Sequence, residues 1–173
     1  MKKISFFYRD FGSLSGAVAQ RGNHFADAVL QNGAHEDFDL LIYCANLGDT
    51  PRQAHLRAQT VFSLNQDNRA GFLARALDEL LIGVHVGFKS VFRRSDLFVI
   101  STPPYISGLV IALFQIFFRR QFAIDVRDMY PLAYLDAGLI RDGGLLHRIF
   151  NGLNRFIFKR AAFIVCSTPG QLC

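Results

Sequence analysis

The chain has 173 residues, of which 51% are hydrophobic and 19% are charged, and its formal net charge is +5. This length fits one domain, and the apolar fraction excludes intrinsic disorder. The three cysteines, Cys44, Cys166 and Cys173, form no CxxC pair and no disulfide framework, so we expect a reducing, cytoplasmic compartment. The five histidines show no metal-ligand spacing, and we therefore expect no bound metal and no cofactor.

Short apolar segments alternate with helical patterns along the chain. The predicted strands are residues 3–8, 38–45, 97–101, 122–126 and 162–167, with a further short strand at 60–64. The predicted helices are residues 17–31, 68–93, 106–118 and 145–160. In the second helix the residues at helical spacing are Phe72, Leu73, Ala76, Leu77, Leu80, Leu81 and Val84. This alternation predicts a parallel sheet with helices on both faces, which is a Rossmann-like α/β fold.

One segment, residues 97–118, contains no charged side chain and is long enough to cross a bilayer. However, the polar and proline residues at 101–104 divide it into a strand and a short helix. We therefore predict a helix that covers the sheet rather than a membrane span.

Ligands of an open parallel sheet bind beyond the carboxyl ends of its strands. The predicted loops at that edge are residues 9–16, 102–104, 127–131 and 168–170. Gly12 and Gly16 precede a helix N-terminus, where free amides and the helix dipole favour an anion such as a phosphate. Because the loop lacks GxGxxG spacing and a P-loop lysine, it is equally well explained as a plain glycine-containing connection.

Three charged residues, Asp125, Arg127 and Asp128, end an otherwise apolar strand. Alternation along the strand places Asp125 and Arg127 on the same side. Buried charges are costly unless they are paired or used. One interpretation is an Asp125–Arg127 ion pair with Asp128 capping a turn; the other is that these side chains hold sugar hydroxyls or an acceptor phosphate.

The helix at 145–160 combines apolar and aromatic residues with basic ones, among them Arg148, Arg155 and Lys159. A basic amphipathic helix of this kind can lie on an anionic membrane surface, and Arg119 and Arg120 beside the apolar helix favour that interpretation. An ordinary packed helix with one solvated side has the same pattern. No recognition motif supports nucleic-acid binding.

Several strings of residues resemble the N-terminal domain of retaining glycosyltransferases of the family 4 type, which have the GT-B fold. These strings are FAIDVRDMYP at 122–131, AGLI at 137–140, NRFIFKRA at 154–161, STPG at 167–170 and DLFVISTPP at 96–104. The first predicted helix is similar to that of the family as well. The bacterial enzymes of this type that the chain resembles most act in surface-polysaccharide and O-antigen assembly.

The resemblance implies an enzyme that moves a sugar from a nucleotide-sugar donor to a lipid-linked or glycan acceptor with retention of configuration. It assigns Asp125, Arg127 and Asp128 to catalysis, and Gly12, Ser13, Gly16, Thr102, Pro103, Tyr130, Thr168 and Gly170 to substrate binding. A lipid-linked acceptor also implies peripheral contact with the inner membrane.

The chain departs from the family pattern at several places. Met129 and Tyr130 stand where the family has Leu-Trp, and Ala34 separates Gly33 from His35. The family binds its donor mainly through a C-terminal domain that carries a pair of glutamates, which this chain lacks. We therefore expect residues 1–173 to be a single acceptor-side domain, truncated before the donor-binding domain and inactive alone.

Two other functions remain open. The chain could be a non-catalytic subunit that docks to a membrane or an acceptor and recruits a separate catalytic partner. It could also be a generic Rossmann-like binding protein for a nicotinamide or a flavin, although it carries no fingerprint for either.

Overall fold

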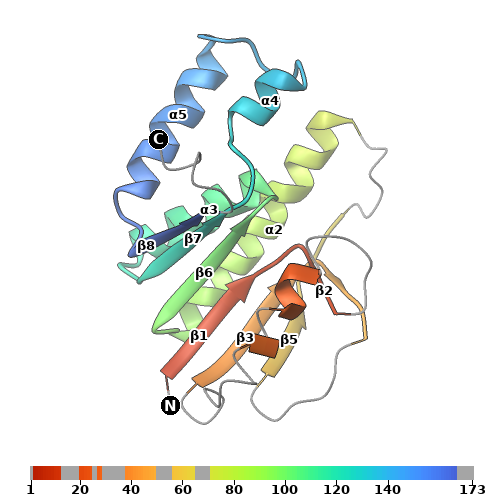
Figure 1. The fold of residues 1–173 in the computed structure, drawn as a ribbon, viewed down its shortest axis with the longest axis vertical. Coiled ribbons are helices and arrows are strands. Elements are labelled where there is room, and N and C mark those ends of the chain that lie inside the picture. Colours follow the sequence, from red (N-terminus) through yellow and green to blue (C-terminus); the bar gives the residue numbers. More distant parts are fainter. Residues whose placement is uncertain are drawn as a thin grey trace.

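The computed structural model describes residues 2–12, 20–24, 27–28, 38–49, 56–64 and 71–166 (Figure 1). The strands are β1 (Lys2–Phe7), β2 (Asp10–Phe11), β3 (Phe38–Cys44), β4 (Asn46–Leu47), β5 (Leu56–Thr60), β6 (Leu97–Thr102), β7 (Phe122–Val126) and β8 (Phe163–Cys166). The helices with assigned bounds are α2 (Phe72–Arg93), α3 (Tyr105–Phe117), α4 (Leu132–Asp136) and α5 (Leu145–Phe158). Residues 20–24 and 27–28 are also helical.

Six strands form one parallel sheet in the order β5-β3-β1-β6-β7-β8. Numbered by their place in the chain, these strands have the order 3-2-1-4-5-6, which is the doubly wound Rossmann arrangement. The two short strands β2 and β4 pair separately, just beyond the ends of β1 and β3. The predicted Rossmann-like α/β fold is therefore confirmed.

The two faces of the sheet are covered by different parts of the chain. The first face carries α2, α3 and α5, and its core includes Phe7, Tyr43, Phe98, Ile100, Phe122, Ile124, Ile82, Val86, Ile111 and Ile157. The second face carries the helical residues 20–24, and its core is formed by Phe6, Tyr8, Phe11, Leu40, Ile42 and Cys44 (Figure 1). Successive strand residues thus bury alternate side chains on opposite faces, as a parallel sheet covered on both sides requires.

The structure corrects two of the predicted boundaries and adds one helix. The strand predicted at 60–64 lies at 56–60, where LRAQT has no continuous apolar run; as an edge strand, β5 tolerates polar side chains. The helix predicted from about residue 68 begins at Phe72, with Gly71 as its N-cap residue. Helix α4 was not predicted, because it is a single short turn after Pro131 with no periodic signal of its own.

Within the described residues, no helix is both long enough and apolar enough to cross a bilayer. Helix α3, from the uncharged segment, spans 13 residues and packs along α2 and β6. This agrees with the prediction of a covering helix.

Candidate functional site

The strand order changes direction between β1 and β6, so the segments that follow these two neighbouring strands leave toward opposite sides of the sheet. Such a switch point opens a crevice at the carboxyl ends of the strands. The loops after β1, β6 and β7 lie at this edge (Figure 1). The candidate site is built from their side chains and from the helices beside them.

On the second face, the Asp125 carboxylate is held by two groups. Arg21 donates a hydrogen bond of 2.6 Å to one oxygen, and Ser101, its neighbour on β6, donates one of 3.1 Å to the other. The Asp125 side chain is buried, while that of Arg21 is 37% exposed. The ion pair expected with Arg127 is thus made with Arg21, a residue far away in the sequence.

Tyr8, at the end of β1, lies beside this ion pair. Burial raises the pKa of Tyr8 well above its usual range, and the negative charge of Asp125 raises it further, while the charges of Arg21 and Arg127 oppose this effect. The charges of Asp125, Arg21 and Arg127 thus all act on the buried Tyr8 hydroxyl. The second face of the site combines the buried Asp125 carboxylate with the partly exposed Arg21 guanidinium.

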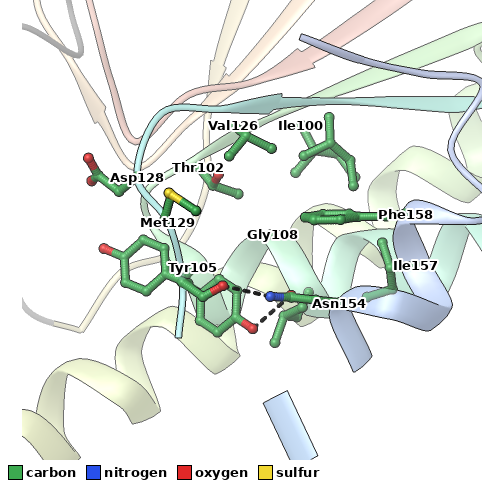
Figure 2. A pocket seen from close by; sticks show the side chains of 13 residues that line it. Ile100, Thr102, Tyr105, Gly108, Val126, Asp128, Met129, Asn154, Ile157 and Phe158 are labelled. Carbon is green, nitrogen blue, oxygen red and sulfur yellow. Dashed lines mark hydrogen bonds between the residues drawn. The ribbon is translucent and has the colours of Figure 1, made fainter. Parts of the chain in front are cut away.

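On the first face, a cavity of about 100 Å³ lies between β6, β7, α3 and α5 (Figure 2). Its walls are mainly apolar and include Ile124, Val126 and Ile157, with Asp128 and Tyr130 among the lining residues. Because Ile124 and Val126 face this cavity, Asp125 between them points away from it. Asp128 lines this cavity and Asp125 does not, so these two of the three residues assigned to catalysis do not face the same cavity.

A hydrogen-bonded aromatic network supports the loop that carries Asp128. The Tyr105 hydroxyl donates to Asn154 Oδ1 at 2.8 Å, and Asn154 Nδ2 donates to the Tyr130 backbone carbonyl at 2.7 Å (Figure 2). The Tyr105 and Tyr130 rings stack with centroids 4.5 Å apart. Burial, together with the negative charges of Asp128 and Glu79, raises the pKa of Tyr130 to about 12, so its hydroxyl stays protonated at neutral pH.

A second, more polar cavity of about 240 Å³ lies on the other side of Tyr130, between α2, α3 and α4. Arg75, Glu79 and Tyr134 contribute polar groups to its lining. Glu79 Oε2 accepts a hydrogen bond of 2.9 Å from the Ile106 amide in the first turn of α3. Burial raises the pKa of Glu79, although this hydrogen bond and the nearby arginines Arg9 and Arg75 partly offset the effect.

Thr102 and Gly12 have mainly structural contacts. The Thr102 hydroxyl donates to the backbone carbonyl of Asp125 at 3.4 Å and lines the apolar cavity. Gly12 has a φ of +91°, and a Cβ there would lie 2.6 Å from the carbonyl oxygen of Gly48, so only glycine fits. The Gly12 amide donates to Asn23 Oδ1 at 3.2 Å and is therefore engaged rather than available to an anion.

Four residues assigned to substrate binding, Ser13, Gly16, Thr168 and Gly170, lie outside the described residues. Pro103 is half-buried between β6 and α3. Of the assigned set, the structure brings Thr102, Asp128 and Tyr130 together on the first face, where all three line the apolar cavity.

The sequence patterns did not indicate three contributors to the site: Glu79, Arg75 and Asn154. Glu79 directly follows Asp78 in a helix rich in leucine, and acidic residues among leucines are a weak signal that a tertiary partner exists. Asn154 sits on the buried side of α5 with Ile157, where an amide needs hydrogen-bond partners. No local pattern distinguishes Arg75 from an ordinary solvated arginine.

Comparison with known proteins adds little to this geometry. No protein-family model matches the chain, and no curated protein matches it. A solved structure described as "Crystal Structure of UDP-galactose 4-epimerase" aligns with 72% of this chain at 9% sequence identity and a TM-score of 0.41. The alignment spans 55% of that structure's chain, about half of its length.

A likeness at this level carries no argument about activity. The class that the fold defines is a Rossmann-like α/β protein with a candidate site at its switch point, and this rests on the strand order and on the side chains described above. The resemblance to a glycosyltransferase domain stays a prediction.

Proposed function

We propose that the chain is the acceptor-binding, N-terminal part of a glycosyltransferase that moves a sugar from a nucleotide-sugar to a lipid-linked or polysaccharide acceptor with retention. One observation carries the proposal. Residues 125–130, the segment that resembles the family most specifically, end a central strand at the switch-point edge and direct polar side chains to both faces of the sheet.

The chemistry of these side chains suits a glycosyl diphosphate. Arg21 on the second face and Arg127 directly after β7 supply positive charge, which favours a phosphate group, and the Arg21–Asp125 pair holds the Arg21 guanidinium in position. Asp128 and the protonated Tyr130 hydroxyl can accept from and donate to sugar hydroxyls. In this proposal Asp125 positions Arg21, while Arg127 and Asp128 contact the substrates.

The polar cavity beside Tyr130 extends the same surface. Glu79 and Arg75 add an acceptor and a donor within reach of Tyr134, a combination that suits a ligand rich in hydroxyl groups. The donor would be bound mainly by a second domain, so the 173-residue chain by itself is expected to bind an acceptor without catalysing transfer.

Binding of a polyprenyl-diphosphate-linked sugar in detergent, measured by ligand-observed NMR, tests this proposal. We expect the chain to bind it, and the double variant Asp128→Asn/Tyr130→Phe to bind it about thirtyfold more weakly, since each weakened hydrogen bond to a polar ligand costs about 1 kcal/mol. The matched control is Asp136→Asn on α4, which makes the same charge change at an exposed carboxylate away from both cavities.

Three outcomes would contradict parts of the proposal. Equal affinity in the double variant and the control would show that the acceptor does not bind on the first face. Failure of the unmodified chain to bind the acceptor would contradict its proposed role in acceptor binding. Turnover of a nucleotide-sugar by the chain alone, at the rate of a two-domain transferase, would show that no donor domain is needed. Co-purification with a separate polypeptide that carries the family's glutamate pair would instead identify a docking subunit.

A further inference from the structure

The solvent-facing side of α2 is apolar along its whole length. Six large side chains on it are 42–80% exposed: Leu73, Leu77, Leu80, Val84, Phe88 and Phe92. They recur every three or four residues over a helix that is about 33 Å long. The opposite side packs inward and is formed by Asp78, Ile82, Gly83, Val86, Gly87 and Ser90. A surface helix normally turns polar side chains toward solvent, and an apolar patch of this extent marks an interaction site.

Helix α3 continues this apolar surface at one end. The two helices lie side by side and run in the same direction, because Gly83 meets Ser107, Gly87 meets Phe114, and Gln115 donates to Ser90 Oγ at 2.7 Å (Figure 1). Their C-terminal ends are therefore level. There α3 adds Leu113, Phe117 and Phe118, of which Phe117 is 81% exposed.

The charge around this surface is mainly positive; the exposed Asp96, two positions after Arg94, accepts a hydrogen bond of 2.7 Å from the Lys3 amide. Arg94 directly follows α2, and Arg119 follows α3 after Phe118; both arginines are exposed. Lys89 lies near the C-terminal end of α2, and Arg120 follows Arg119. Helix α3 carries no charged residue. The two acidic residues of α2 are turned elsewhere, because Asp78 accepts from the Leu64 amide at 2.6 Å and Glu79 from the Ile106 amide.

We propose that the outward side of α2, together with the C-terminal end of α3, docks on the surface of a bilayer that contains anionic lipids. Charge complementarity selects this occupant. The surface offers aromatic and aliphatic side chains bordered by cations, which is the composition that binds the boundary between headgroups and acyl chains. A second copy of the same surface would bring mainly like charges, its own Arg94 and Arg119, against these arginines.

This docking surface is distinct from α5, the basic helix that the sequence pattern favours for membrane contact. Helix α5 turns Asn154 and Ile157 toward the tyrosine network and the apolar cavity. The proposal depends on α2 and α3 alone and holds whether or not the chain takes part in glycosyl transfer.

Flotation of the 173-residue chain with lipid vesicles tests the proposal. We expect the chain to float with vesicles of equal parts phosphatidylcholine and phosphatidylglycerol, and at least tenfold less with phosphatidylcholine alone. The double variant Leu77→Ser/Phe88→Ser should lose most of its binding to the anionic vesicles. Both positions are more than half exposed, so the thermal unfolding curve should change little.

Matched variants on α5 make the location testable. Leu146→Ser/Ile149→Ser replaces two side chains that are 48% and 45% exposed and should leave flotation unchanged. For the charges, Arg94→Asn/Arg119→Asn should weaken binding to the anionic vesicles roughly tenfold or more. Both arginines have a φ of 53°, which asparagine tolerates. Arg141→Asn/Arg148→Gln removes the same charge near α5 and should have little effect.

Four results would overturn the proposal. These are equal binding to the two kinds of vesicle, no binding to either, equal losses in the α2 and α5 variants, or a dimer in analytical ultracentrifugation that the α2 variant converts to a monomer while vesicle binding stays unchanged. The last result would identify a second copy as the occupant of the surface.

Discussion

At the end of β7, the two faces of the sheet carry side chains of different chemistry. On the second face, Asp125 forms an ion pair with Arg21 and accepts from Ser101. On the first face, one residue further along, Val126 lines an apolar cavity bordered by stacked tyrosines. A single step along a strand thus separates an electrostatic cluster from an aromatic one, so neighbouring residues of one motif need not act in one site.

The largest expected effect on stability comes from breaking the electrostatic cluster. Asp125→Ala leaves the Arg21 guanidinium and the Ser101 hydroxyl without their acceptor, and we expect the free energy of unfolding to fall by about 2–3 kcal/mol. The partial exposure of Arg21 keeps the loss below that of a fully buried pair. Urea unfolding measures it, with Asp128→Ala as the control, which should cost less than about 0.5 kcal/mol at an exposed carboxylate. Equal losses would show that the buried ion pair adds nothing to the free energy of unfolding.

Breaking the hydrogen-bonded aromatic network on the first face should lower the free energy of unfolding somewhat less. Asn154→Ala removes the acceptor of the Tyr105 hydroxyl and the donor to the Tyr130 carbonyl, and we expect a loss of about 2 kcal/mol in the same unfolding measurement. Tyr105→Phe/Asn154→Ala should recover part of it, because the buried hydroxyl is then gone as well. If the double variant were less stable than Asn154→Ala, the hydrogen bond would not be the source of the loss.

Replacing Glu79 should have a smaller effect on stability, and this effect should depend on pH. Its pKa is raised in the folded state above the ordinary value of 4.5, so the folded chain binds the proton more tightly than the unfolded chain. Stability from this group is fully present below pH 4.5 and is lost as the pH rises through the raised pKa. Relative to the unmodified chain, Glu79→Gln should therefore become more stable between pH 4 and pH 7 in a series of thermal unfolding curves; a difference that shrinks with rising pH would contradict the raised pKa.

The smallest expected change is Tyr130→Phe. Within the described residues the Tyr130 hydroxyl forms no hydrogen bond, and the ring stack on Tyr105 is retained, so unfolding should change by less than about 0.5 kcal/mol. Acceptor binding should nevertheless weaken if this hydroxyl contacts a sugar. A large loss of stability would instead assign Tyr130 to the support of the fold.

Much of the fold could be predicted from local patterns. The apolar segments that became β1, β3, β6, β7 and β8 stand out because strands buried on both faces are continuously apolar. Strand β5 was misplaced since an edge strand can be polar, and α4 was missed since one helical turn has no period. The loops at the carboxyl edge followed from the topology, but the partners in the site did not. Arg21 and Asp125 are 104 residues apart, and no local signal joins them.

Helix α2 shows which structural features local sequence determines and which features depend on tertiary packing. The apolar spacing from Phe72 to Val84 determined that this segment is a helix, since periodicity is a local property of the chain. Only the tertiary structure decided which side is buried. A Cβ at Gly83 would lie 2.8 Å from the Cβ of Val110, so the side with glycine and Ser90 is the one that can approach α3 closely. Close packing thus turned the small residues inward together with Ile82 and Val86, and left the larger leucine and phenylalanine side chains facing outward.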